Sequence, residues 1–304
     1  MKKDLRIIYM GTPEFAVPSL EILIENGYNI VAVLTAPDKP KGRGQQLSTS
    51  PIKDVAIAHN IPVLQPANLK KPEFIEELRS YHANLQIVVA FRMLPEIVWD
   101  MPKIGTFNLH GSLLPQYRGA APINWAIING EKETGVTTFF LKHQIDTGNV
   151  IFQEKEPIAH EDNVGTVYER LMGRGAKLVL KTVQAIEEGE YPQLPQDESV
   201  HINHAPKIFK ETCEINWDQP SEKVYDFIRG LSPYPTAWTM IGKKSCKIFK
   251  TQITEKKLSP GAIDTDNKTY LHFGTLGAAL SIEDLQLQGK KRMDIGSFLR
   301  GNKI

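Results

Sequence analysis

The sequence predicts an α/β protein with a doubly wound, mostly parallel sheet, followed by a smaller all-β domain. In the first part of the chain, short apolar runs alternate with helical segments, which is the pattern of a parallel sheet covered by helices. After Lys207, shorter apolar runs alternate with Gly, Asp and Lys turns, and a small β-barrel is expected there. We therefore predict a first domain over residues 1–188, a linker over 189–206 and a second domain over 207–304.

The first strand and helix of the expected sheet lie near the start of the chain. The run Leu5–Tyr9 predicts a buried strand. Thr12 and Pro13 then predict the cap and the first turn of a helix that stops at residues 26–27, Asn-Gly. A second strand, rich in β-branched residues, is expected over 30–35.

Three more strands and one long helix complete the predicted first domain. Strands are expected over 85–90, 104–109 and 135–141, and the long periodic segment 163–188 is expected to be a helix. Ligands of doubly wound sheets sit beyond the carboxyl ends of the parallel strands. The segments that follow the third and fourth strands should therefore converge on one crevice.

A change in composition marks the linker and the second domain. Pro and acidic residues are frequent in the predicted linker, which should be extended. One helix is expected over 221–230, and the apolar runs 246–249, 269–273 and 279–282 are expected to be strands of the barrel.

The overall composition is that of an ordinary globular protein. The 304 residues are 41% hydrophobic and 23% charged with a formal net charge of +1, so nothing global indicates a polyanionic partner. From Lys207 onward, 16 Lys and Arg stand against 11 Asp and Glu, a mild basic excess that permits nucleic-acid contact. Cys213 and Cys246 have no metal-binding spacing, and no apolar stretch approaches the ~20 residues of a membrane helix. We expect a reduced, cytoplasmic protein.

Three polar residues define the candidate catalytic site. Asn108 and His110 are two residues apart at the end of an expected strand, so their side chains should share a face. Asp146 follows after about one α/β unit, which would return it to the same end of the sheet. An amide and an imidazole can donate to a developing oxyanion, and a carboxylate can orient the imidazole and accept a proton. The trio indicates transfer of a small carbonyl-derived group to an amine, without a metal or a covalent nucleophile.

Each member of the trio also has an ordinary structural explanation. Asn or Asp beside Gly is common in turns, and a lone His is more often structural than catalytic. The tripeptide 146–148, Asp-Thr-Gly, also matches the aspartic-protease signature, but no second copy occurs and the domain is not all-β.

Other motifs are incomplete. Gly11 stands where a dinucleotide fingerprint would begin, but no second glycine follows at the required spacing. Ser112 lacks the G-x-S-x-G context of a nucleophile. His201 and His204 form one H-x-x-H pair without a third ligand, so no metal is expected.

Two basic clusters could contact a large anionic substrate. Lys39, Lys41 and Arg43 lie in a Gly- and Lys-rich loop that leaves the sheet after the second strand, at the edge of the expected crevice. The second cluster, residues 290–292, lies near the end of the chain.

These segments resemble the methionyl-tRNA formyltransferases nearly end to end. Those similar to the family's opening, basic loop and catalytic core are 10–20, 37–51, 108–115, 118–123 and 146–148. Those similar to its C-terminal domain are 204–208, 228–233 and 289–293. All enzymes that act on 10-formyltetrahydrofolate share the core motif; the basic loop and the C-terminal segments narrow the match.

Two positions depart from the pattern of the family. Gly111 stands where the family commonly has alanine, a change of one methyl group. The segment 91–95, Phe-Arg-Met-Leu-Pro, replaces a tyrosine-glycine beginning. It is more similar to the folate-pocket segment of glycinamide ribonucleotide and sugar-nucleotide formyltransferases.

The resemblance implies a Rossmann-like catalytic domain, an OB-like barrel and a defined reaction. The formyl group of 10-formyltetrahydrofolate would pass to the α-amine of methionyl initiator tRNA, with no metal and with the protein as a monomer. Asn108 and His110 would stabilise the oxyanion, and Asp146 would hold His110 and accept the amine proton. The residues implied to wall the folate pocket are Arg92, Met93, Leu94, Ser112, Leu113, Leu114 and Pro115. Those implied to contact tRNA are Lys39, Lys41, Arg43, Lys290, Lys291 and Arg292.

The sequence is also compatible with two other functions. Formyl transfer to a sugar nucleotide or another small amine would use the same core, but it needs neither the basic loop nor the barrel. A non-catalytic RNA-binding protein on the same scaffold would bind tRNA without formylating it, although all three polar residues of the core are in place.

Overall fold

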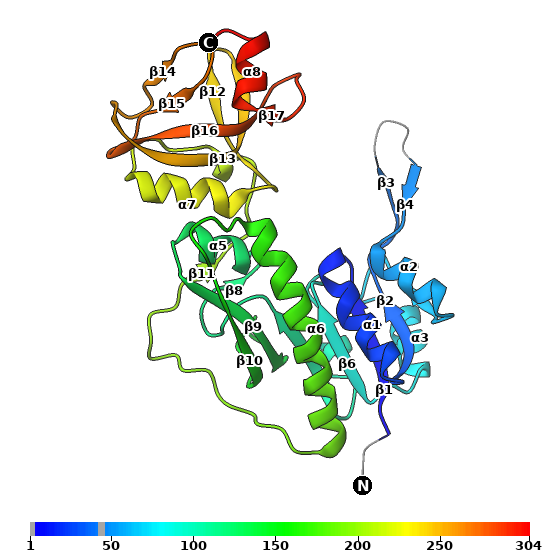
Figure 1. Ribbon diagram of the computed structural model, residues 1–304. Helices are drawn as coiled ribbons and strands as arrows, with labels where there is room; N and C mark the ends of the chain where they lie inside the picture. Colours follow the sequence, from blue (N-terminus) through cyan, green and yellow to red (C-terminus); the bar gives the residue numbers. More distant parts are fainter. Residues whose placement is uncertain (1–3, 42–45) are drawn as a thin grey trace. The chain divides into compact units, whose positions relative to one another are not determined.

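The computed structural model describes residues 4–41 and 46–304, which form two compact units (Figure 1). The first unit consists of Met1–Arg118, Gly135–Glu156 and Glu169–Asn203, and the second of Gly119–Thr134, Pro157–Tyr168 and His204–Ile304. Two short segments from the predicted first domain, 119–134 and 157–168, thus belong to the second unit. The linear boundaries at 188 and 206 stay a prediction.

The first unit is built on a seven-stranded sheet. In spatial order its strands are β10 (Val150–Pro157), β9 (Glu133–Phe140), β7 (Gly105–His110), β6 (Leu85–Val89), β1 (Arg6–Gly11), β2 (Asn29–Leu34) and β5 (Val63–Leu64). The five strands from β7 to β5 are parallel, and β9 is antiparallel to β7. The doubly wound, mostly parallel sheet that the sequence predicts is confirmed.

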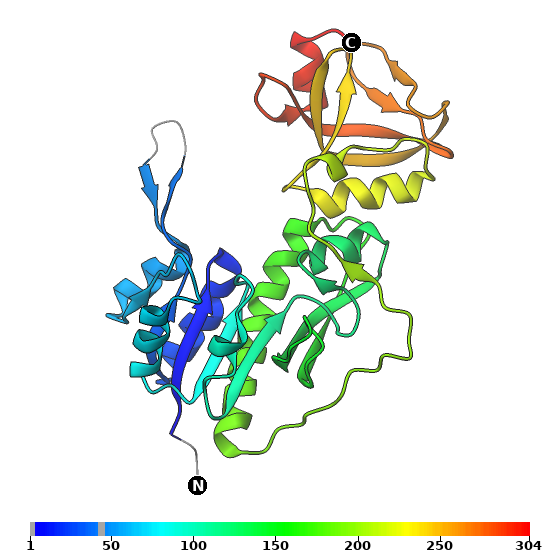
Figure 2. The same ribbon diagram turned by 180° about the vertical axis from the view of Figure 1, so that it is seen from behind.

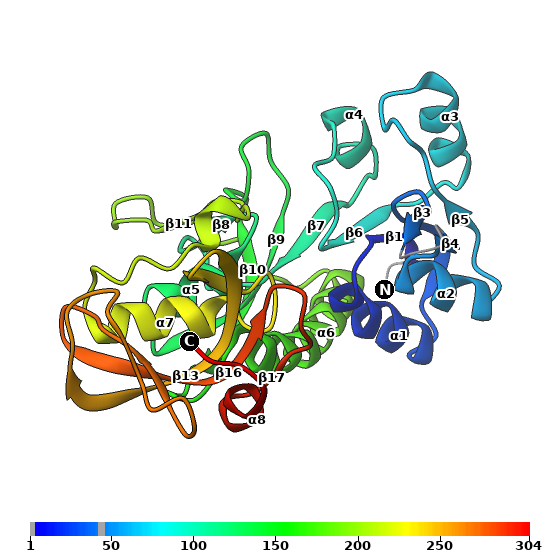
Figure 3. The ribbon, with the colours of Figure 1, turned by 90° about the horizontal axis from the view of Figure 1, so that it is seen from above.

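Helices cover both faces of this sheet, as Figure 3 shows. On one face lie α1 (Val17–Glu25) and α6 (Val164–Glu188), and on the other α3 (Pro72–Ser80) and α4 (Glu96–Trp99). All five residues of β6 are buried, and four of them are apolar, as expected for a central strand that is covered on both faces. No helix among residues 4–41 and 46–304 is both long and apolar enough to cross a membrane.

The first helix begins later than predicted. A 3-10 turn, η1 (Glu14–Ala16), follows Pro13, and α1 begins at Val17 without a side-chain cap. Thr12 Oγ1 instead accepts a hydrogen bond from the backbone N of Ala36, at 3.3 Å. The capping role predicted for Thr12 is wrong, because its hydroxyl joins the segments that follow β1 and β2.

The direction of β9 is the largest departure from the prediction. A parallel strand after a crossover helix was expected before Asp146. The connecting helix α5 (Pro122–Ile128) has only seven residues, a length of about 10 Å, and it belongs to the second unit. A crossover has to return the chain along the full length of a strand, and α5 is too short for that. Asp146 is therefore brought to the sheet by the loop between β9 and β10.

The second unit is an antiparallel sheet with a helix packed against it (Figure 2). In spatial order its strands are β12 (Ala237–Ile241), β13 (Lys244–Lys257), β16 (Ala278–Leu287), β15 (Leu271–Phe273) and β14 (Ile263–Thr265), with β17 (Met293–Asp294) beside β16. Register shifts along the pair β13–β16 bend this ladder, as bulges do in small barrels. The antiparallel all-β character predicted for the C-terminal domain is confirmed.

A single apolar core holds this sheet and α7 (Ser221–Leu231) together. Val224, Ile228 and Leu231 of α7 belong to the same buried cluster as the inward side chains of β13, β15 and β16. The rings of Trp217 and Phe273 stack within this core, with their centroids 4.5 Å apart. The remaining elements are β3 (Lys39–Lys41), β4 (Gln46–Ser48), α2 (Pro51–Ala58), β8 (Arg118–Gly119), β11 (His204–Ala205), η2 (Glu211–Cys213) and α8 (Ile295–Gly301).

Candidate active site

His110 ends β7 at the carboxyl edge of the parallel strands, with only 7% of its side chain exposed. Its Nε2 lies 2.9 Å from the carbonyl oxygen of Tyr117, and its Nδ1 lies 3.8 Å from Oδ2 of Asp146. A carbonyl oxygen can only accept, so Nε2 carries a proton. In the neutral ring the lone pair of Nδ1 would then face a carboxylate. Nδ1 is thus the ring nitrogen that the Tyr117 carbonyl oxygen leaves available, and it lies on the side of Asp146.

Asp146 lies in a tight turn of the β9–β10 loop. Its φ of +56° is in the left-handed region, which Asp and Asn tolerate better than other side chains. Two residues later, a Cβ on Gly148 would overlap the carbonyl oxygen of Phe140. The Asp-Thr-Gly sequence thus combines a residue that accepts positive φ with one that allows close backbone approach. This combination sets the carboxylate beside His110.

Replacing Gly148 by Ala is expected to destabilise the protein by about 1–3 kcal/mol or more, because the added methyl group meets backbone rather than a movable side chain. Urea or thermal unfolding measures this loss. The matched control is Gly173→Ala in α6, where a Cβ would meet nothing within 4 Å. There, the higher helix propensity of Ala should stabilise the protein by up to about 1 kcal/mol. Equal stability of both variants would contradict the close approach at Gly148.

Asn108 lies two residues before His110 on β7, so both side chains leave the same face of the strand. The Asn108 side chain is partly buried, and among the described residues it has no hydrogen-bond partner. An amide N–H is therefore available on the face of His110. The structure thus gathers all three predicted catalytic residues at one edge of the sheet: Asn108, His110 and Asp146.

The loop after β7 is held by hydrogen bonds to its own backbone and to β9. The Ser112 hydroxyl is fully buried and donates to the carbonyl oxygen of Gln116, at 2.6 Å. Thr137 Oγ1 donates to the Ser112 carbonyl oxygen at 2.6 Å and accepts from the backbone N of Leu114 at 3.2 Å. These bonds fix the position of Tyr117, whose carbonyl oxygen faces His110. Ser112 has a structural role in this loop.

Leu141 packs against two buried clusters, and each of them also involves a residue of a predicted folate segment. Leu94 packs with Leu141 against one buried cluster of the sheet. Leu114 belongs to a second cluster, against which Leu141 also packs. The segments 92–94 and 112–115 thus pack against neighbouring clusters that Leu141 connects, while Leu113 and Pro115 remain partly buried.

Arg92 and Met93 differ in what they offer to a ligand. The Arg92 guanidinium donates to the carbonyl oxygens of Pro66 and Ala67, and burial lowers its pKa. It thereby ties the segment after β6 to the loop after β5. Met93 is 76% exposed, so its side chain is available for contact.

Hydrogen bonds of Asp38 fix the chain at the base of the basic loop, where the loop begins. Lys39 is exposed on β3, Lys41 ends that strand, and Arg43 lies outside the described residues. At the base, Asp38 Oδ2 lies 2.5 Å from Nζ of Lys53, and Asp38 Oδ1 accepts from Nε2 of Gln65 at 2.8 Å. The hydrogen bond from Lys53, followed by that from Gln65, holds the pKa of Asp38 below its usual range.

The basic cluster near the C-terminus is divided by its contacts. The Arg292 guanidinium binds both carboxylate oxygens of Asp284, at 2.5–3.1 Å, and lies 4.0 Å from the ring centroid of Phe249. Lys290 and Lys291 are exposed, and neither has an ion pair within the described ranges. Lys290 and Lys291 are thus the members of this cluster whose charge is free to meet a phosphate.

Among the residues that the structure describes, no group of three or more His, Cys, Asp or Glu could hold a metal ion.

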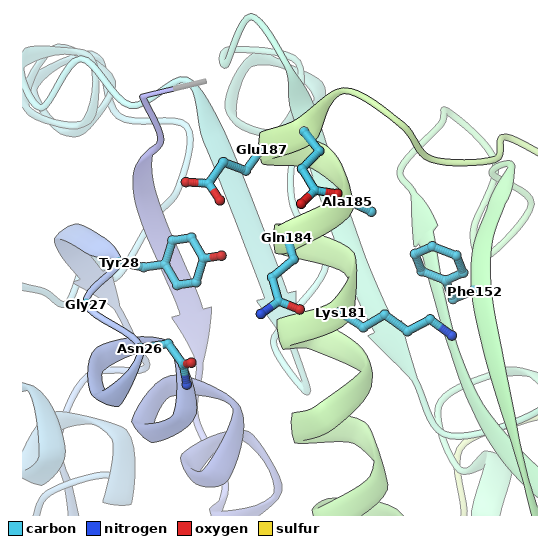
Figure 4. A pocket seen from close by; sticks show the side chains of 9 residues that line it. Asn26, Gly27, Tyr28, Phe152, Lys181, Gln184, Ala185 and Glu187 are labelled. Carbon is cyan, nitrogen blue, oxygen red and sulfur yellow. The ribbon is translucent and has the colours of Figure 1, made fainter. Parts of the chain in front are cut away.

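One hollow of the first unit lies away from the candidate active site. A hollow of about 670 Å³ lies between α6 and the start of β2, with Tyr28, Lys181 and Gln184 on its walls (Figure 4). It is at the amino end of β2, whereas ligands of such sheets bind beyond the carboxyl ends.

Two partners of the site were not predicted. The Tyr117 carbonyl oxygen is a backbone group, which every residue has, so the residue type could not predict its contact with His110. Gln196 lies in the linker and donates through Nε2 to the carbonyl oxygens of Asp146, at 2.7 Å, and Gly148, at 2.9 Å. A single glutamine in an extended segment carries no periodic or motif signal that could identify it.

Comparison with known proteins agrees with this architecture. Residues 5–183 match the family model described as formyl transferase, and residues 207–303 match that of the formyl transferase C-terminal domain. Among solved structures, WlaRD, a sugar 3N-formyl transferase, is 22% identical with a TM-score of 0.69, over 95% of this chain and 100% of that one. HypX from Aquifex aeolicus, in complex with tetrahydrofolic acid, is 20% identical with a TM-score of 0.65, over 98% of this chain and 47% of that one. At such identities these two structures show the fold alone.

Curated relatives are much more similar. The methionyl-tRNA formyltransferase of Bacteroides fragilis is 56% identical over 310 residues, which cover 99% of this chain and 96% of the relative. That of Parabacteroides distasonis is 55% identical over 314 residues, with coverage of 99% and 97%. The chain therefore belongs to the formyl transferase family and, within it, to the methionyl-tRNA formyltransferases.

Proposed function

We propose that this enzyme transfers the formyl group of 10-formyltetrahydrofolate to the α-amine of methionine on initiator tRNA by direct attack of the amine. The observation that supports this mechanism best is the setting of His110. Its Nε2 is engaged by a backbone carbonyl, while its Nδ1 faces Asp146 beside the unpaired amide of Asn108. Two N–H donors, one from Asn108 and one from His110, next to the Asp146 carboxylate suit the transfer of an acyl group to an amine.

The proposed roles follow from which atoms are available. As the amine nitrogen bonds to the formyl carbon, the formyl oxygen gains negative charge. Asn108 Nδ2 and the protonated Nδ1 of His110 donate to that oxygen. Asp146 accepts the proton that the amine loses, directly or through one water, since 3.8 Å separates it from Nδ1 and leaves that N–H free to reach the substrate. The carbon–nitrogen bond to the donor then breaks, and the leaving nitrogen takes up the proton that Asp146 accepted, directly or through the same water, so that the carboxylate is restored.

The residues present suit a formyl folate as the donor, which supplies the one-carbon unit. An unpaired amide donor and apolar side chains from two segments lie at the same edge of the sheet. Met93, Leu94 and residues 112–115 would line the folate pocket. Arg92 would fix the position of its own segment through its hydrogen bonds to the carbonyl oxygens of Pro66 and Ala67. No metal enters these steps.

For the acceptor, we propose that Lys39, Lys41 and Arg43 contact the acceptor end of the tRNA. Lys290 and Lys291 would contact its phosphates elsewhere, with Arg292 held beside them by Asp284. Such contacts make the binding depend on salt concentration. The cytoplasmic location and the monomeric state stay predictions.

The direct test is to supply 10-formyltetrahydrofolate with three acceptors: methionylated initiator tRNA, uncharged initiator tRNA and an amino-sugar nucleotide. We expect N-formylmethionyl-tRNA from the first and no formylated product from the others. Formylation of the sugar nucleotide alone would replace the proposed acceptor. Binding of charged tRNA without any product at saturating donor would support a non-catalytic protein instead.

Replacing Asp38 by Asn is expected to raise the KM for charged tRNA by about three- to tenfold at nearly constant kcat. The change removes the ion pair with Lys53 and loosens the base of the basic loop, while the catalytic trio stays untouched. Steady-state kinetics at low salt measures the effect, with exposed Asp54→Asn on α2 as the matched control. An unchanged KM would show that the base of the loop does not influence tRNA binding.

A further inference from the structure

We infer that Gln196, in the linker, is a positioning residue for the catalytic carboxylate; the inference rests on the proposed role of Asp146. Gln196 Nε2 donates to the carbonyl oxygens of Asp146 and Gly148, at 2.7 and 2.9 Å. Its Oε1 accepts from Nε and Nη2 of Arg118, at 3.0 and 2.7 Å. The side chain therefore clamps the turn on both sides of Thr147.

The chemistry of the three partners fixes how this amide is oriented. A guanidinium only donates, so Oε1 of Gln196 has to face Arg118. The two carbonyl oxygens only accept, so the NH₂ group has to face them. The other orientation would leave every one of these contacts repulsive. The amide is thus held in one orientation by a side chain of which only 11% is exposed, that of Arg118.

A second anchor lies two residues earlier in the linker. Leu194 exchanges two backbone hydrogen bonds with Val150, at 2.8 and 2.9 Å, and so pairs the linker with the start of β10. This pairing places Gln196 at the loop that ends in β10. The linker is therefore a structural part of the catalytic loop as well as a connection between domains.

The loop needs such a clamp. Residues 142–145, just before Asp146, are exposed, and loops with few buried contacts open easily. Asp146 itself has a φ of +56°, which the surrounding structure has to maintain. A displacement of about 1 Å in a reacting group can cost on the order of 100-fold in rate. Holding the carbonyl oxygens of Asp146 and Gly148 keeps the carboxylate in place against His110.

The test compares Gln196→Glu with Gln193→Glu. Glu at 196 keeps an acceptor for Arg118 but turns a carboxylate oxygen toward two carbonyl oxygens, so the turn should shift. We expect kcat to fall by about 10- to 100-fold, with both KM values within about threefold. Gln193 is exposed in the same linker and, in the part of the chain that the structure describes, has no hydrogen-bond partner; its variant should retain wild-type kinetics.

Two further variants separate the possible outcomes. Gln196→Ala removes the clamp without adding a charge, and the kcat of each variant is expressed per folded molecule from its unfolding curve. A lower melting temperature with an unchanged kcat per folded molecule would overturn the inference, because a merely structural role predicts that result. Asp146→Asn is assayed in parallel. If it abolishes activity while both variants at 196 keep wild-type kcat, only the inference falls; if it stays active, the proposed role of Asp146 falls.

Discussion

Replacing Asp146 by Asn is expected to lower the kcat of formyl transfer by about 10²- to 10⁴-fold, because the amide cannot accept the proton that the amine loses. The substrates should still bind, so both KM values should stay within a few-fold. Single-turnover assays with charged initiator tRNA and 10-formyltetrahydrofolate separate this loss of chemistry from slow product release.

Asn is the appropriate substitution because it leaves the turn intact. Asp146 has a φ of +56°, and Asn adopts such values as readily as Asp, whereas Ala would add backbone strain to the loss of charge. Gln196 donates to the carbonyl oxygen of residue 146, so this contact does not depend on the side chain at that position. Asp100→Asn, the same change at an exposed position after α4, is the control. Activity of the Asp146 variant within a few-fold of wild type would refute the proposed role.

Much of the fold could be predicted because local pattern and global fold agree. The buried strands β1 and β6 are mostly apolar, and α6 shows a helical period over 25 residues. The direction of β9 could not be read in this way. An isolated strand pattern is the same in a parallel and an antiparallel pair, and only the length and course of α5 decide between them.

The same distinction explains which parts of the site were predicted. Asn108 and His110 share a face by the two-residue period of a strand, so their proximity follows from the sequence. Tyr117 contributes only a carbonyl oxygen, which every residue has, and Gln196 acts from a segment without periodicity. The residue types of a sequence indicate its side-chain chemistry, whereas contacts made by the backbone or by an extended linker depend on the tertiary fold.

These two contacts also restrict how the proposed catalytic residues can meet the substrate. Because the Tyr117 carbonyl oxygen occupies Nε2, only Nδ1 of His110 remains for the substrate, on the side of Asp146. Because Gln196 holds the Asp146 turn, that side keeps its geometry. We therefore expect the formyl oxygen to approach Nδ1, which lies toward the same face as Asn108.

Replacing Asn108 by Leu should test this arrangement, with an expected loss of kcat of about 10²- to 10³-fold, the usual cost of removing one oxyanion donor. Leu has nearly the same shape as Asn, and the Asn108 amide has no hydrogen-bond partner among the described residues. The substitution therefore leaves no other polar group unpaired, and the free energy of unfolding should hardly change. Steady-state formylation and urea unfolding together measure both effects.

The matched control is Asn29→Leu, which makes the same change on a strand of the same sheet. Asn29 is exposed at the amino end of β2, the end opposite the proposed site, so its variant should keep wild-type kcat. If the Asn108 variant also kept wild-type kcat, His110 Nδ1 would have to stabilise the oxyanion without it. If the Asn108 variant raised the KM for the folate and left kcat unchanged, the amide would bind the ground state and the transition state equally. Only a loss in kcat places Asn108 at the oxygen that becomes charged.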